Sequence, residues 1–132
     1  MKVYLDTSAI YALISKSDRY HGEAASTYKM LLDSNLELWI NSFVLGEVIN
    51  LIWYRMGKGL AITTARWLLD EMNVRWLGED EVREVLDEAA EAPAENRLSL
   101  VDWSLVRLAS QENAQVFTFD EKIRSASIRV LP

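Results

Sequence analysis

Four carboxylates stand where the sequence gives little reason for a purely structural charge. Asp6 and Asp120 each follow a β-branched and aromatic run, in MKVYLDTSAI and VFTFDEKI, near opposite ends of the 132-residue chain. Glu47 and Asp102 each lie in an otherwise apolar helical run, in NSFVLGEVINLIWYRMG and RLSLVDWSLVRLAS. Carboxylates are costly to bury unless a positive charge joins them, and Mg²⁺ and Mn²⁺ prefer oxygen ligands. The four acids together therefore predict a metal-dependent enzyme.

Each of these acids also has a structural interpretation that needs no metal. Asp6 and Asp120 can cap the helices that follow them. Asp102 lies at a helix start, where the helix dipole stabilises a carboxylate, and Glu47 can share a solvent-facing stripe with Asn50. The metal interpretation is favoured because it accounts for all four acids at once.

The elements that must position these acids alternate along the chain. Strands are predicted over residues 3–5, 36–40, 74–77, 115–119 and 128–131. The predicted helices cover residues 9–16, 21–35, 43–55 with Ser42 as N-cap, 65–73 beginning from Thr63 or Thr64, 79–92, 100–113 and a helical turn at 121–126. This α/β alternation predicts a mostly parallel sheet covered on both faces. Active sites of such sheets lie beyond the carboxyl ends of the strands, where Asp6 and Asp120 fall.

Length and composition narrow the classes of protein that fit. The chain length predicts one domain over residues 1–132. With no cysteine and a single histidine, His21, disulfides, a cysteine nucleophile and a zinc site are not expected. The net charge of −6 argues against a broadly basic nucleic-acid-binding surface, although it does not exclude a nucleic-acid substrate. We expect no membrane association and a cytoplasmic location. The five tryptophans are expected mainly in the core, with one or two exposed for a partner.

The chain resembles PIN-domain ribonucleases, in particular the VapC-like toxins of type II toxin-antitoxin pairs. The resemblance rests on the segments LDTSAIYALI, NSFVLGEVINLIWYRMG, LSLVDWSLVRLA and VFTFDEKI, in this order and spacing, and it covers nearly the whole chain. It implies an α/β fold, a three-layer α/β/α sandwich with a mostly parallel sheet of about five strands. It also implies a homodimer, a cognate antitoxin protein as partner, and hydrolysis of RNA phosphodiester bonds with Mg²⁺ or Mn²⁺ as cofactor.

The resemblance also assigns roles to individual residues. The catalytic and metal-binding acids that it implies are Asp6, Glu47, Asp102 and Asp120, and the supporting hydroxyls are Thr7, Ser8 and Thr118. It leaves open whether one or two ions bind and which acid orients the attacking water. Two positions depart from the family pattern. Val101 stands where a hydroxyl residue often precedes the third acid, and Ile123 stands where an aromatic residue commonly follows the fourth.

The sequence also offers three arginines as candidates for RNA contact, and it allows three functions other than a ribonuclease to be weighed. Arg55, Arg97 and Arg124 are candidates for holding the RNA backbone, and each can equally be a surface charge. A phospho-acceptor receiver domain would need paired acids at the first strand end, and a haloacid-dehalogenase-type phosphatase would need an acid at Ser8. The remaining alternative is a catalytically silent PIN-like module that only binds a partner protein.

Overall fold

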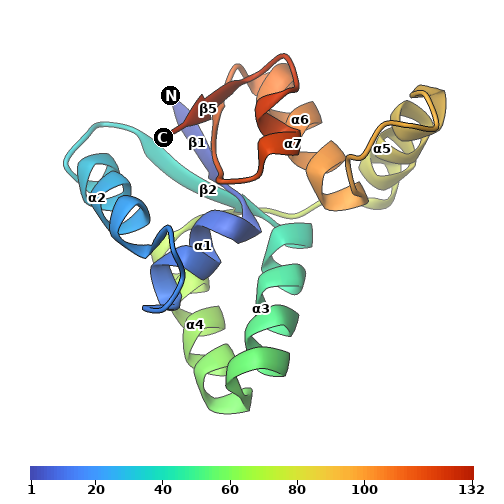
Figure 1. Cartoon of the computed structure of the whole chain (residues 1–132). Coiled ribbons are helices and arrows are strands. Elements are labelled where there is room, and N and C mark those ends of the chain that lie inside the picture. The colour runs from blue at the N-terminus through green and yellow to red at the C-terminus, as the bar shows by residue number, and fades with distance from the viewer.

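A parallel sheet of five strands forms the centre of the molecule (Figure 1). The structure is a computed structural model that describes residues 1–132. The strands are β1 (Lys2–Leu5), β2 (Glu37–Asn41), β3 (Asn73–Arg75), β4 (Gln115–Phe117) and β5 (Arg129–Leu131). Their order is β3-β2-β1-β4-β5, and all four pairings are parallel. The predicted mostly parallel sheet is therefore confirmed, and it is parallel throughout.

Seven helices connect the strands and cover both faces of the sheet (Figure 1). They are α1 (Thr7–Ile14), α2 (His21–Leu32), α3 (Ser42–Met56), α4 (Lys58–Glu71), α5 (Glu79–Glu91), α6 (Leu100–Glu112) and α7 (Glu121–Arg124). Right-handed crossovers place α1 to α4 on one face and α5 to α7 on the other, because the chain reverses its direction across the sheet after β3. The expected α/β/α sandwich is confirmed.

The reversal creates a switch point between the neighbouring strands β1 and β4, where parallel α/β sheets commonly bind ligands. β1 is central in the sheet, and its residues Val3, Tyr4 and Leu5 are fully buried. Such an apolar run is typical of a parallel strand that is covered on both faces. The strand thus provides a fixed base for the residue that follows it, Asp6.

Two predicted helix starts are wrong. Asn41, not Ser42, caps α3, because its side-chain oxygen accepts a hydrogen bond of 2.9 Å from the Val44 N–H. Ser42 is the first helical residue, and its hydroxyl instead accepts from the Leu77 N–H. Helix α4 begins at Lys58, several residues before the predicted start. Gly57, at φ 102°, lets α4 follow α3 directly, and the packing between the two helices outweighs the low helix propensity of Gly59.

The tryptophans are less buried than the sequence suggests. Trp53 and Trp76 are exposed, as expected of one or two of them, and the other three are only half-buried. Trp39 and Trp67 pack against the buried core, whereas Trp103 is not among the side chains that do so. No helix combines the length and apolar character that crossing a membrane requires.

Candidate active site

The four acids singled out in the sequence line one cavity at the carboxyl edge of the sheet, which we call the acid pocket. Asp6 directly follows β1, Asp120 lies just beyond β4, Asp102 is in the first turn of α6, and Glu47 is in the second turn of α3. The cavity has a volume of about 480 Å³. Its lining comprises Asp6, Thr7, Ser8, Tyr11, Asp18, Tyr20, Glu47, Leu51, Arg55, Ser99, Asp102, Phe119, Asp120 and Lys122. Five carboxylates thus face two basic side chains.

Asp6 is the most deeply buried of these acids, with 4% of its surface exposed. Its Oδ1 accepts a hydrogen bond of 2.7 Å from the Thr7 N–H, which caps α1, and its Oδ2 accepts from the hydroxyls of Thr118 and Ser8 at 2.7 and 3.1 Å. Burial raises the pKa of Asp6 from 3.8 to about 6, and the negative charge of Asp102 adds to this rise. The hydrogen bonds that the carboxylate accepts oppose the rise without cancelling it.

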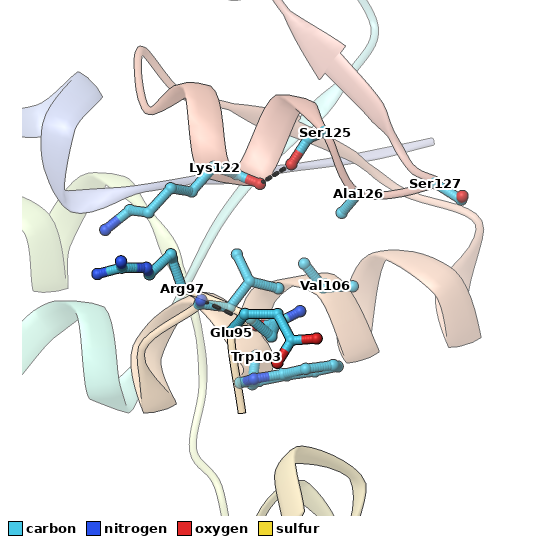
Figure 2. Close-up of a pocket in the computed structure, with 10 residues that line it drawn as sticks. Glu95, Arg97, Trp103, Val106, Lys122, Ser125, Ala126 and Ser127 are labelled. Carbon is cyan, nitrogen blue, oxygen red and sulfur yellow. Dashed lines mark hydrogen bonds between the residues drawn. The ribbon is translucent and has the colours of Figure 1, made fainter. Parts of the chain in front are cut away.

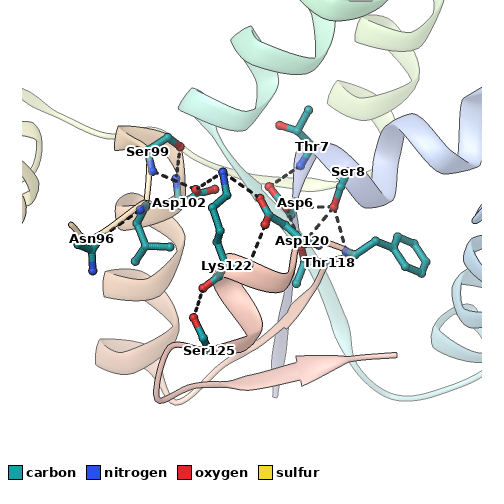
Figure 3. A network of polar contacts seen from close by, with 12 residues as sticks. Asp6, Thr7, Ser8, Asn96, Ser99, Asp102, Thr118, Asp120, Lys122 and Ser125 are labelled. Atoms are coloured by element: carbon teal, nitrogen blue, oxygen red, sulfur yellow. Dashed lines mark hydrogen bonds and ion pairs between the residues drawn. The ribbon is translucent and has the colours of Figure 1, made fainter.

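The two hydroxyls tie the ends of β1 and β4 together (Figure 3). The Thr118 hydroxyl donates to Asp6 and accepts from the Asp120 N–H at 3.0 Å. The Ser8 hydroxyl also donates to Asp6, and it accepts from the Phe119 N–H at 3.0 Å. Because each hydroxyl bridges the Asp6 carboxylate and the backbone after β4, the network fixes the loop that carries Asp120 relative to Asp6.

Asp120 caps α7, as its structural interpretation predicts, and Asp102 lies in the first turn of α6, where it completes a capping box with the N-cap residue Ser99. Asp102 Oδ2 accepts from the Ser99 N–H at 3.0 Å while the Ser99 hydroxyl accepts from the Asp102 N–H, a capping box at the start of α6. Asp120 Oδ1 accepts from the Lys122 N–H at 2.9 Å at the start of α7. Both carboxylates line the acid pocket while they make these hydrogen bonds, so capping and a place at the pocket are compatible.

Lys122 is a residue of the site that the sequence reasoning missed. Its Nζ lies 4.0 Å from Asp102 Oδ2 and 3.8 Å from Asp120 Oδ2, between the two carboxylates (Figure 3). The signal in the sequence was a lysine two residues after Asp120, on the first turn of the short helix EKIR. The lysine shows that the arrangement attracts a cation, since its ammonium group stands where the negative charge is concentrated.

An aromatic wall forms another part of the acid pocket, and it was not predicted either. The rings of Tyr20 and Phe119 are stacked, with centroids 4.6 Å apart and planes 10° apart. On a further part of the lining, the Arg55 guanidinium lies 5.4 Å from the centroid of the Tyr11 ring. The pocket therefore combines carboxylates, aromatic faces and a flexible positive charge.

The side chains present fit the chemistry of a hard divalent cation. The donor set consists of carboxylate and hydroxyl oxygens, the ligands that Mg²⁺ and Mn²⁺ prefer. Thr7 Oγ1 is buried at the pocket without a hydrogen-bond partner, so it is available to a ligand or its water. No three acidic or histidine side chains are yet arranged to hold an ion, and Glu47 is exposed. An ion in this pocket would therefore be held after side-chain rotation or partly through water.

The three arginines proposed for RNA contact lie in different places. Arg55 lines the acid pocket, and Arg97 lines a neighbouring cavity. Arg124 lines neither cavity. Its guanidinium is within hydrogen-bond distance of the backbone oxygens of Thr118 and Pro132, at 3.4 and 3.2 Å, and it lies near the Glu121 carboxylate. This geometry favours a structural role for Arg124, next to β5.

The family of the protein follows from a comparison with family models. The model described as PIN domain matches residues 3–128, nearly the whole chain. The chain belongs to the PIN domain family. The match spans all four acids of the pocket, so the site described above lies wholly within the PIN domain.

Solved structures share the fold of this PIN domain at low sequence identity. The sarcin-ricin-loop-cleaving toxin VapC20 of Mycobacterium tuberculosis is 21% identical, with a TM-score of 0.84 over 96% of this chain and 95% of that one. DNA-bound VapBC of Salmonella typhimurium is 15% identical, with a TM-score of 0.71 over 99% and 97%. VapBC2 of Rickettsia felis, bound to a DNA fragment of its promoter, is 19% identical, with a TM-score of 0.65 over 99% and 98%. No curated protein matches the sequence.

Proposed function

We propose that this PIN domain is a Mg²⁺- or Mn²⁺-dependent endoribonuclease, a hydrolase of RNA phosphodiester bonds. The observation that carries the proposal is the convergence of Asp6, Glu47, Asp102 and Asp120 on one cavity at the switch point of the sheet. Helix capping accounts for three of these acids singly, but it does not account for their being gathered at one cavity, where like charges repel and burial raises the pKa of Asp6. A cation shared among them would offset both costs.

The acids would divide the work of holding the ion. Asp6 and Asp120 would hold the central ion, and Glu47 and Asp102 would ligate it directly or through water. The chemistry that a divalent ion would supply there is to offset the negative charge of the phosphate oxygens and to lower the pKa of a bound water molecule. In the hydrolysis the water oxygen joins phosphorus, the P–O ester bond breaks, and the proton lost by the water ends on the leaving oxygen.

The remaining groups of the pocket would orient the acids and the RNA. Ser8 and Thr118 hold the Asp6 carboxylate in one orientation, because both donate to its Oδ2. The stacked Tyr20 and Phe119 rings offer a face to an unpaired base, which is how proteins commonly hold single-stranded RNA. Arg55 is exposed on another part of the lining, near Tyr11, and can contact a phosphate.

We further propose that the protein is the toxin of a toxin-antitoxin pair and forms a homodimer. The resemblance to VapC-like toxins and the fold shared with VapBC proteins support this. Trp53 and Tyr54 on α3 are 46% and 90% exposed, an aromatic surface that a dimer or an antitoxin segment would cover. An antitoxin that directs a basic side chain at the acid pocket would neutralise the acids and block the site.

Metal-dependent cleavage of pooled RNA tests the enzymatic proposal. We expect the purified protein to cut RNA with Mg²⁺ or Mn²⁺ and not with EDTA. Glu47→Gln removes one charge at an exposed position, so the fold should be unaffected while cleavage falls by about 100-fold or more. Glu23→Gln, a matched change at an exposed position of α2, should cleave like the wild type. Cleavage by Glu47→Gln at the wild-type rate would remove Glu47 from the catalytic acids, and no metal-dependent cleavage by the wild type at all would favour the catalytically silent binding module.

A further inference from the structure

A second cavity adjoins the acid pocket and shares Lys122 with it (Figure 2). We call it the Trp103 cavity. It has a volume of about 530 Å³, within the range of small-molecule sites, and it lies between α6, the segment before it, and the turn from α7 to β5. Asp102 lines the acid pocket and the next residue, Trp103, lines this cavity, so the same turn of α6 serves both.

The Trp103 cavity combines an aromatic surface with positive charge. Trp103 is half-exposed and does not pack against the core, unlike Trp39 and Trp67. Figure 2 shows the charged ends of Arg97 and Lys122 extending toward the same side of the cavity. These two cations face one carboxylate, that of Glu95, in a chain whose net charge is −6. Lys122 already lies near Asp102 and Asp120 of the acid pocket, whereas Arg97 forms no ion pair and is the cation of this cavity that can meet a phosphate.

We propose that the Trp103 cavity is a nucleobase subsite for the RNA nucleotide next to the cleaved bond, an inference that rests on the proposed ribonuclease function. Base stacking on an aromatic side chain combined with a cation on the backbone is the usual way of holding single-stranded RNA. Lys122 contacts the carboxylates of the acid pocket, so a phosphate that it holds lies at the boundary between the two cavities. The base of that nucleotide then reaches Trp103, and the phosphate on its other side reaches Arg97.

The hydrogen-bonding and basic groups of the lining favour a nucleotide over an apolar segment of a partner protein. Asn96 and Ser125 supply groups that can hydrogen-bond a base edge, and the Arg97 guanidinium complements a phosphate.

Nucleotide binding can be measured without cleavage. In EDTA, NMR titration of the full chain with AMP, CMP, GMP and UMP should shift the indole N–H resonance of Trp103 and leave that of Trp76, which is 61% exposed elsewhere, unchanged. The Trp103 resonance is assigned by its loss in Trp103→Leu. An unchanged Trp103 resonance with all four nucleotides would overturn the proposal.

A second measurement uses a fluorescent single-stranded RNA in EDTA. Trp103→Leu should weaken binding about 5-fold or more, and Trp103→Phe, which keeps an aromatic face, should weaken it less. Arg97→Gln should weaken it as well, whereas Trp76→Leu and Arg83→Gln, changes at exposed positions outside the cavity, should not. Should Trp103→Leu fail to fold, Trp103→Phe assigns the resonance instead, and Arg97→Gln and the wild-type titration decide.

The outcomes separate this proposal from the proposed function. RNA binding that depends on Trp103, in a protein that never cleaves RNA, would support the subsite and refute the ribonuclease. Cleavage and RNA binding that are unchanged in both Trp103→Leu and Arg97→Gln would support the ribonuclease and refute the subsite. Loss of antitoxin binding with unchanged RNA binding in these variants would show that the cavity is a protein-docking site and that the proposal is wrong.

Discussion

Replacing Asp6 with asparagine should stabilise the metal-free protein near neutral pH. Burial and the neighbouring Asp102 raise the pKa of Asp6 from 3.8 to about 6, so keeping this group charged in the folded state costs up to roughly 3 kcal/mol. Asp6→Asn removes that cost and keeps nearly the same shape. The amide oxygen can still accept the Thr7 N–H that caps α1.

Part of this gain in the free energy of unfolding is lost because Asp6→Asn changes the hydrogen bonds made at Oδ2. The Ser8 and Thr118 hydroxyls both donate to that oxygen, and an amide nitrogen in its place would make them accept instead. Their protons would then need new partners, at a cost of about 1 kcal/mol. We therefore expect a net rise in the free energy of unfolding of about 1–2 kcal/mol at about pH 7.5.

The gain should depend on pH in a defined direction. The folded pKa lies above the unfolded one, so the wild-type protein bears the full cost above about pH 6 and none below about pH 4, where Asp6 is protonated in both states. The advantage of Asp6→Asn should therefore shrink as the pH falls through this window. Urea unfolding in EDTA at several pH values measures it, with Asp87→Asn on the exposed face of α5 as control. A variant less stable than the wild type at neutral pH, or a gain that does not change with pH, would refute the reasoning.

Three further predictions concern the rest of the site and the surface. Lys122→Met should bind Mn²⁺ about 5-fold more tightly in an electron paramagnetic resonance titration, because the ammonium group no longer competes for two carboxylates; equal or weaker affinity would contradict this. Thr118→Val should raise the pKa of Asp6 above about 6 in an NMR titration and cost about 1–3 kcal/mol in urea unfolding, since it removes a buried hydrogen bond. Light scattering at micromolar concentration should give about twice 15.1 kDa for the wild type and a monomer for Tyr54→Glu, and a wild-type monomer would defeat the dimer proposal.

Much of the fold could be predicted because the hydrophobic patterns of individual segments agree with the places of those segments in the sheet. The apolar run before Asp6 is typical of a buried parallel strand, and in the structure β1 is central and buried. The start of α4 could not be predicted, because two glycines in MGKG suggest a break. Only the observed backbone shows that Gly57 makes the turn while Gly59 is helical.

The four acids of the candidate site could be predicted, Asp6 and Asp120 from chain geometry and Glu47 and Asp102 from their apolar helical runs and the family resemblance, whereas the contacts between side chains could not. Carboxyl ends of parallel strands meet at one edge, and this placed Asp6 and Asp120 together. Lys122 lies 20 positions from Asp102 along the chain, and nothing local in the sequence shows that its ammonium group turns back toward that acid. The stacking of Tyr20 on Phe119 likewise depends on tertiary packing between distant segments.

The central claim is that the four carboxylates of the acid pocket share a divalent cation, and anomalous X-ray diffraction from crystals grown with Mn²⁺ tests it most directly. The account predicts a manganese peak in the acid pocket, about 2 Å from oxygens of Asp6 and Asp120, with Glu47 and Asp102 bound to it directly or through water. It also predicts that the Lys122 ammonium group has moved away from its place between Asp102 and Asp120. Manganese that binds elsewhere on the protein, or a pocket that stays empty at Mn²⁺ concentrations that support RNA cleavage, would contradict the account.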